Sequence, residues 1–189
     1  YIVGRLDAPI TIVHKSNKAT GSEVIKLGNN SAVKEHVDCG VQEGVQAIAI
    51  ASYQGGHVGF FKNMYELRGE KGAGHVKIFG GGGGIILPEE IKELHAYGIN
   101  RIYAPDDGRA LGLQGMINDL VSQCDFAIGD ELPEGFILDK DHKEHVGRAI
   151  SAFENFPENS KAILDQVRKE SKNSTVPVLG ITGTGGAGK

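Results

Sequence analysis

Short apolar runs along the chain alternate with segments whose apolar residues recur at helical spacing. The apolar runs are residues 24–27, 47–51, 76–79 and 101–104, and they are followed by Gly28, Ser52, Gly80 and Pro105. Runs of this length that end at small residues or proline are typical of β-strands. The run at 47–51 is apolar throughout, which predicts a strand buried on both faces, as in a parallel sheet.

The segments between these runs have the spacing of amphipathic helices. Ser31 can begin a helix that places Val33, Val37 and Val41 on one face, and further helices are expected at residues 56–70 and from Pro88 to about residue 98. The strongest helical stripe consists of Leu113, Met116, Ile117, Leu120, Val121 and Cys124. Residues 2–3 and 10–18 would supply a first strand and a first helix, although their pattern is weaker.

Strand and helix thus alternate about five times before residue 125. Parallel strands need crossover connections, and helices normally provide them. The sequence therefore predicts an α/β domain over residues 1–124, with a doubly wound, flavodoxin-like parallel sheet of about five strands. Residues 125–175 are expected to form a helical linker interrupted at Pro157, with an inward face made of Val146, Ile150, Phe153, Ile163 and Val167.

The last residues have the pattern of a phosphate-binding loop. An apolar stretch from Pro177 leads into G-x-x-x-x-G-K, and residues 176–189 are therefore expected to be the first strand and P-loop of a GTPase domain. In a full-length protein the nucleotide phosphates would be held by Gly183, Gly185, Gly186, Gly188 and Lys189. The motif as given includes neither the hydroxyl for Mg²⁺ nor the following helix, so we expect a fragment that does not hold GTP and Mg²⁺ by itself.

Composition narrows the function without assigning it. A net charge of −4 and the absence of Trp disfavour nucleic acid as a partner, and no apolar run is long enough to cross a membrane. Cys39 and Cys124 lie far apart, as expected of reduced thiols in a cytoplasmic protein.

Ligands of an open parallel sheet bind at the carboxyl ends of the strands. In this chain those ends carry Gly28, residues 52–57, the five glycines at 80–84, and residues 105–108. Such glycines leave room for a broad, flat ligand to approach the backbone, although a merely flexible loop is the alternative. Asp106 and Asp107 are expected to stabilise a turn and to accept hydrogen bonds from ligand amides, rather than to bind a metal or act in acid–base catalysis.

Several of these segments resemble one known family. The sequences of residues 52–57, 79–90, 95–98 and 105–116 closely resemble the cobalamin-binding domain of the fused isobutyryl-CoA mutases. The resemblance implies an adenosylcobalamin-dependent carbon-skeleton isomerisation of isobutyryl-CoA and n-butyryl-CoA. It also implies GTPase and acyl-CoA-binding domains in the same polypeptide, and a homodimer at full length. This fragment lacks the substrate barrel and is not expected to be active alone.

The same resemblance assigns the cofactor site. Its residues in this sequence are Asp7, Gly28, Ser52, Tyr53, Gln54, Gly55, Gly56, Gly80, Gly81, Gly82, Gly83, Pro105 and Asp106. The glycine edges would seat the lower side of the corrin ring, and a slot beside the second strand would take the displaced nucleotide tail.

The cobalt ligand is the point at which the sequence departs from the family. The family pattern Asp-x-His-x-x-Gly falls on Gly4 and Leu6, and a leucine has no lone pair for cobalt. His14 and His57 are not placed like the missing ligand. Either the opening segment is shortened and misaligned, or cobalamin binds weakly without His ligation, or the domain is an interaction scaffold that has lost the cofactor. A phosphoacceptor domain is disfavoured because the third strand ends in Ala51-Ser52 rather than in acids.

Overall fold

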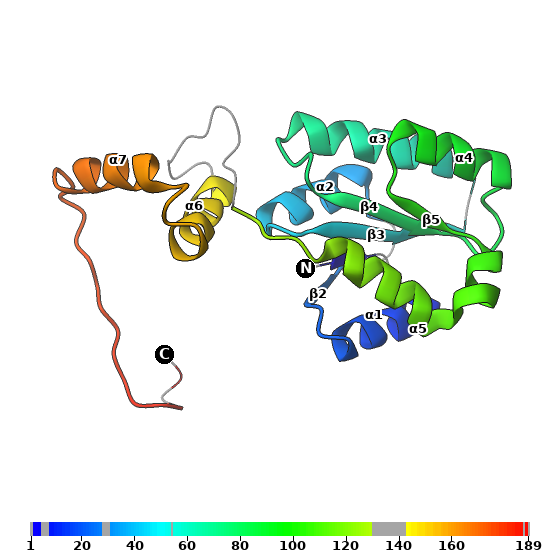
Figure 1. The fold of residues 1–189 in the computed structure, drawn as a ribbon, viewed down its shortest axis with the longest axis horizontal. Helices are drawn as coiled ribbons and strands as arrows, with labels where there is room; N and C mark the ends of the chain where they lie inside the picture. The colour runs from blue at the N-terminus through cyan, green and yellow to red at the C-terminus, as the bar shows by residue number, and fades with distance from the viewer. Residues whose placement is uncertain are drawn as a thin grey trace.

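The computed structural model describes residues 2–4, 8–27, 31–53, 55–129, 143–186 and 188. Five parallel strands form one sheet in the order β2-β1-β3-β4-β5 (Figure 1). Their bounds are Ile2–Gly4 for β1, Val24–Lys26 for β2, Ala47–Ala51 for β3, Lys77–Gly81 for β4 and Arg101–Tyr103 for β5. The predicted flavodoxin-like, doubly wound α/β fold is confirmed.

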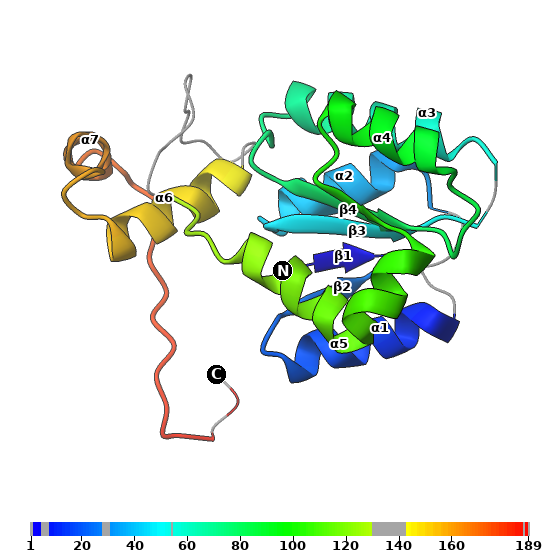
Figure 2. The same cartoon turned by 45° about the vertical axis from the view of Figure 1, so that its right-hand side comes forward.

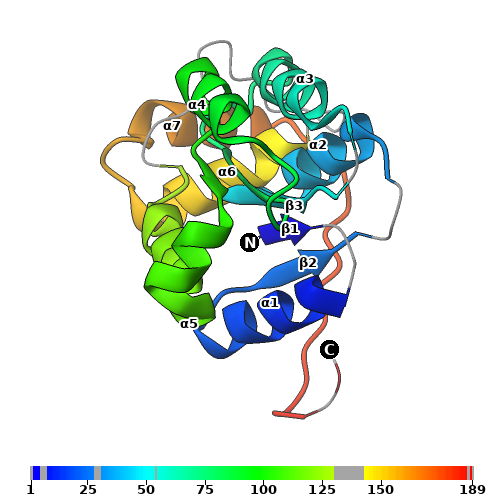
Figure 3. The same ribbon diagram turned by 90° about the vertical axis from the view of Figure 1, so that its right-hand side faces the viewer.

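Helices cover both faces of the sheet, as the three views show (Figures 1, 2 and 3). One face is covered by α1 (Ala8–Ala19) and α5 (Pro105–Cys124). The other is covered by α2 (Val33–Gln42), α3 (His57–Glu70) and α4 (Pro88–Tyr97). This arrangement follows from the alternation of strands and helices, because each crossover helix must bury its apolar stripe against the sheet.

The two faces of the sheet are packed differently. The larger core lies under α2, α3 and α4, and its fully buried members include Val37, Ile48, Phe61, Met64, Ile78, Leu94 and Ile102. On the α1 and α5 face, the buried cluster consists of Ala47, Phe79 and Leu120. Strand β3 alternates alanine and isoleucine, so the side that carries Ile48 is filled while the alanine side leaves room.

Two expectations about the strand ends were wrong. The fourth strand was expected to end before the glycines, but β4 includes Gly80 and Gly81. The turn expected at residues 105–108 is instead the first turn of α5, with Pro105 at its start. The carboxylate of Asp107 accepts a 2.8 Å hydrogen bond from the backbone N–H of Ala104, and an acid at this position stabilises a helix N-terminus.

The helical segment after the sheet contains α6 (Lys143–Asn155) and α7 (Lys161–Ser171). The inward face predicted for its first helix was wrong, because Val146 and Ile150 are 36% and 53% exposed. The buried residues are Ala149 and Ala152, since the backbone at Gly129 approaches α6 so closely that a Cβ there would lie 3.0 Å from the Ala152 nitrogen. Small residues are the ones that permit this close packing.

The residues after α7 run away from the sheet (Figure 1). The strand predicted there is not formed, because residues 174–184 pair with no strand of the described sheet. Val178 and Leu179 are 96% and 85% exposed, so this apolar stretch has no core against which to pack. Among the described residues, no helix is both long enough and apolar enough to span a bilayer.

Candidate functional site

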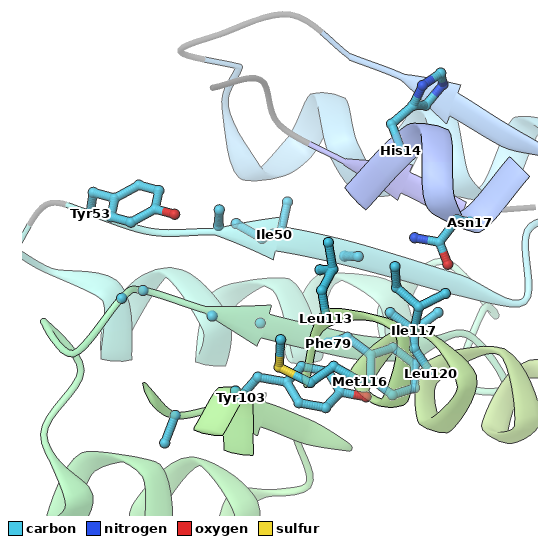
Figure 4. Close-up of a pocket in the computed structure, with 18 of the residues that line it drawn as sticks. His14, Asn17, Ile50, Tyr53, Phe79, Tyr103, Leu113, Met116, Ile117 and Leu120 are labelled. Carbon is cyan, nitrogen blue, oxygen red and sulfur yellow. The ribbon is translucent and has the colours of Figure 1, made fainter. Parts of the chain in front are cut away.

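A cavity of about 360 Å³ lies between the sheet and the helices α1 and α5, and reaches the carboxyl edge of the sheet (Figure 4). Its lining comes from every layer on this side of the molecule. The lining residues are His14, Asn17, Val24, Ile25, Lys26, Ala49, Ile50, Ala51, Tyr53, Phe79, Gly80, Gly81, Gly82, Gly83, Tyr103, Ala104, Pro105, Gly108, Leu113, Met116, Ile117 and Leu120.

The cavity exists because small residues line the sheet where a core would otherwise be filled. Ala49 and Ala51 lie on β3, and Gly81 lies beside them on β4, paired with Ala51. Side chains on alternate positions of a strand point to the same face, so these residues leave one continuous gap. Phe79 is 1% exposed and is the large side chain that these strands contribute to this side.

The α5 wall of the cavity is held in place by side-chain contacts. Tyr103 donates a 2.7 Å hydrogen bond from its hydroxyl to Asp119. Burial, followed by this carboxylate, raises the pKa of Tyr103 well above its usual range, so the phenol stays protonated. Arg101 donates to Asp107 at 2.8 Å near the start of the same helix. The wall is therefore tied to β5 at two points.

Helix α5 is interrupted at Gly112, and residues of its second half line the cavity. Gly112 has φ 65° and ψ 173°, which interrupts the helix, and only glycine adopts this conformation readily. Gln114, just after the break, donates a 3.1 Å hydrogen bond to Thr20 at the end of α1. The two helices that cover the cavity are therefore joined to each other as well as to the sheet.

Two different constraints, close packing and a positive φ, explain glycines in the run 80–84. A Cβ at Gly80 would lie 2.4 Å from the Phe61 ring, and one at Gly82 would lie 2.5 Å from the Ser52 oxygen, so the fold itself requires glycine at both positions. Gly83 and Gly84 have φ of 58° and 95°. Packing of the fold therefore accounts for two glycines of this run, for which room for a ligand was the expected reason.

The starts of α3 and α4, at the carboxyl edge of the sheet, are linked by a partly buried contact between His57 and Glu90. The His57 Nε2 atom lies 2.9 Å from a carboxylate oxygen of Glu90, and the same oxygen accepts a 2.8 Å hydrogen bond from the Leu87 N–H. The Leu87 hydrogen bond and then His57 lower the pKa of Glu90. His57 is 6% exposed and is the first residue of α3.

The structure brings part of the predicted cofactor site together. Of the predicted residues, Tyr53, Gly80, Gly81, Gly82, Gly83 and Pro105 line the cavity. Ser52, Gly55, Gly56 and Asp106 are at the same edge of the sheet but outside the lining, and Asp106 pairs with Arg109. Asp7, Gly28 and Gln54 lie outside the described residues, as does Leu6.

The predicted phosphate loop is separate from this cavity. Gly183, Gly185 and Gly186 lie in the exposed segment that runs away from the sheet, and Gly188 is also exposed. Lys189 lies outside the described residues. In the part of the chain that the structure describes, no cluster of three or more His, Cys, Asp or Glu side chains is arranged to hold a metal ion.

Sequence reasoning missed the helix side of the cavity. His14 and Asn17 line it from α1, and Leu113, Met116 and Leu120 line it from α5, where they were expected to be core. The apolar stripe gave no indication of a gap, because it is the same stripe that a filled core would need. The available signal was the alternation of alanine and isoleucine in β3, which marks one face as under-filled.

The fold and the cavity define a flavodoxin-like α/β domain with a ligand-sized cavity at the carboxyl edge of its sheet. No protein-family model matches the chain. A solved cobalamin-binding protein from Desulfitobacterium hafniense aligns with a TM-score of 0.53 and 15% identity, covering 65% of this chain and 57% of that one. At this identity the likeness shows a shared fold.

Sequence comparisons give closer relatives. A fused isobutyryl-CoA mutase from Geobacillus kaustophilus is 50% identical over 195 residues, covering 97% of this chain and 18% of the relative. The glutamate mutase sigma subunit of Yersinia enterocolitica is 31% identical over 117 residues, covering 59% of this chain and 76% of the subunit. Over 97% of its length the chain is homologous to fused isobutyryl-CoA mutases, at 44–50% identity, and it spans less than a fifth of each of these relatives.

Proposed function

We propose that this chain is the cobalamin-binding module of an adenosylcobalamin-dependent acyl-CoA mutase. The observation that carries the proposal is the cavity that runs from the glycine edge into the space between the sheet and the helices α1 and α5. Such a cavity suits a ligand with a flat part outside the sheet and a narrow part within it. The sequence relatives support the same assignment.

The described residues fit this cofactor. A volume of about 360 Å³ is at the small end of ligand sites, so it suits the nucleotide tail of cobalamin rather than the whole molecule. The corrin ring would then lie outside, over the open backbone at Gly55 and Gly81. A Cβ at Gly55 would meet no atom within 4 Å, and one at Gly81 would meet none closer than 3.6 Å.

Each part of the chain then has a defined task. Gly81, Gly83 and Pro105 would face the ring, while the apolar side chains of α5 would enclose the tail and exclude water. Adenosylcobalamin supplies the radical chemistry by homolysis of its cobalt–carbon bond, and the protein supplies binding and orientation.

The remaining parts of the enzyme would lie in the rest of the polypeptide. We propose an acyl-CoA-binding domain that carries the isobutyryl-CoA or n-butyryl-CoA substrate, and a GTPase domain to which residues 183–189 contribute the phosphate loop with GTP and Mg²⁺. The full-length protein would be a cytoplasmic homodimer. The exposed apolar residues around Val178 support a further domain, because such a stretch is stable only when packed.

One observation favours a second candidate, an interaction domain that has lost the cofactor. Leu6 occupies the position of the cobalt ligand when the chain is aligned from Gly21 back to Gly4. Without His ligation, cobalamin would bind through its ring and tail alone. The retained cavity argues against complete loss, because an unused cavity lowers stability and is free to fill with larger side chains.

Titration of the chain with cobalamin, followed by visible absorption, tests the proposal. We expect saturable binding with a spectrum that lacks His ligation. The double variant Gly4→Asp with Leu6→His should bind more tightly and shift the spectrum towards the His-ligated form. If neither the native chain nor this variant binds cobalamin at high micromolar concentration, the scaffold alternative replaces the proposal.

A further inference from the structure

We propose that the cavity between the sheet and α5 selects corrinoids by their lower base, and that it accepts a benzimidazole while rejecting a purine. This inference rests on the proposed function, since it concerns the tail of the same cofactor. It goes further, because binding of the ring alone does not require any preference for the base.

The inner part of the cavity is apolar on two sides. Phe79 projects from β4, and Met116 and Leu120 face it from α5 (Figure 4). None of these three side chains can donate a hydrogen bond. A benzimidazole presents an aromatic ring with methyl groups and one free ring nitrogen, which suits such walls. Adenine presents several ring nitrogens and an amino group, and each must lose water to enter.

The polar side chains near the cavity do not remove this preference for a benzimidazole over adenine. The Tyr103 hydroxyl is already bonded to Asp119, so its hydrogen is not available to a base. On the α1 side, His14 lines the cavity beside β2, on the side away from the α5 wall (Figure 4). Lys26, at the end of β2, also lines the cavity, but it is exposed to water. Asn17 is 2% exposed and supplies the amide on this wall. One amide can match the single free nitrogen of a benzimidazole, but it cannot match all the polar atoms of a purine.

The cavity cannot easily rearrange to suit a purine. Its sheet side is backbone in regular parallel pairing, and its α5 side is tied to β5 through Tyr103–Asp119 and Arg101–Asp107. A rigid apolar site that leaves polar ligand atoms without partners discriminates strongly against that ligand.

Three corrinoids distinguish the contribution of the lower base to binding from that of the corrin ring. Cobinamide has the same ring without a nucleotide, cobalamin carries dimethylbenzimidazole, and adeninylcobamide carries adenine. We expect the chain to bind cobalamin about tenfold or more tightly than adeninylcobamide, because each buried polar group left without a partner weakens binding by about five- to 150-fold. Adeninylcobamide should bind no better than cobinamide. The readout is the dissociation constant from visible absorption or calorimetry.

A matched pair of variants tests whether the cavity is responsible. Met116→Gln keeps the size of a lining side chain but adds an amide, so it should weaken cobalamin binding and narrow the difference from adeninylcobamide. Leu111→Gln makes a similar change on the same helix at a residue that is 46% exposed and outside the lining. The control should leave the preference unchanged, and neither variant should alter cobinamide binding.

The possible failures are distinguishable. If cobinamide, cobalamin and adeninylcobamide all fail to bind, the proposed function is wrong and this inference falls with it. If all three bind with equal affinity, the function stands and the inference is overturned. Equal binding of cobalamin and adeninylcobamide, both tighter than cobinamide, would show that the tail is held but the base is not selected.

Discussion

The two faces of the sheet differ in how completely side chains fill the space between the sheet and its helices. Under α2, α3 and α4 the space is filled by large residues such as Phe61, Met64 and Ile78, each fully buried. Under α1 and α5 the same strands present alanines and glycine, and a cavity of about 360 Å³ remains. Both faces are covered by helices, so burial from water alone does not distinguish them.

The difference lies in side-chain size at alternate positions of single strands. In β3, Ile48 is packed in the larger core while Ala49 faces the cavity. One face therefore supplies most of the stabilisation from buried apolar area, and the other gives up part of it to the cavity. Changes on the filled face should act on stability, and changes on the hollow face should act on binding.

The largest effect on stability is expected at Phe61. Phe61→Ala should reduce the free energy of unfolding by about 3–5 kcal/mol, because it removes a fully buried ring from a filled core. Leu120→Ala, on the hollow face, should cost less, because its neighbour is already a cavity. Urea unfolding of both variants measures this difference, and equal losses would remove the distinction between the faces.

A smaller loss is expected when a methyl group is added to the filled side of β4. Gly80→Ala places a Cβ 2.4 Å from Phe61 and 2.6 Å from Ile102, so it should cost about 1–3 kcal/mol through overpacking. Gly55→Ala, where a Cβ meets nothing within 4 Å, is the matched control and should be close to neutral. A neutral Gly80→Ala would show that the core is looser than described.

The contact between α6 and the sheet domain should depend on pH. Burial, Arg148 and Arg68 lower the pKa of His75 from 6.5 to about 4, so the folded chain resists protonation that the unfolded chain accepts. This contribution to stability is complete above about pH 6.5 and is lost as the pH falls towards 4. We expect a loss of roughly 1 kcal/mol, reduced by partial exposure.

Chemical denaturation at pH 7 and pH 5 measures the effect. His75→Gln removes the titrating group and should flatten the pH dependence between these two values, whatever its effect on stability at pH 7. An unchanged slope in this variant would assign the dependence to other groups.

Much of the fold could be predicted from the sequence, because strand and helix alternate with clear spacing. The weak opening unit was also predicted, and it forms β1 and α1. The inward face of α6 could not be found this way. Val146 and Ile150 have the right spacing for a core, but the close approach of Gly129 selects Ala149 and Ala152 instead. That choice depends on a contact between distant residues, which periodicity does not contain.

The lining of the cavity was predicted only at the carboxyl edge of the sheet. The glycines and Tyr53 were found because they follow predicted strands, whereas Asn17 and Met116 were not, since a cavity-lining helix residue has the same pattern as a core residue. The structure also shows that Gly80 and Gly82 are required by packing, so glycine content alone overstates the ligand site.

The most direct test of the account fills the hollow face. Ala49→Leu should occupy part of the cavity while leaving the free energy of unfolding within about 1 kcal/mol of the native value, because it adds apolar contact where space exists. Cobalamin affinity, measured by titration alongside cobinamide, should fall to that of cobinamide, whose own affinity should not change. Cobalamin binding that remains as tight as in the native chain would contradict the claim that this face holds the cofactor tail.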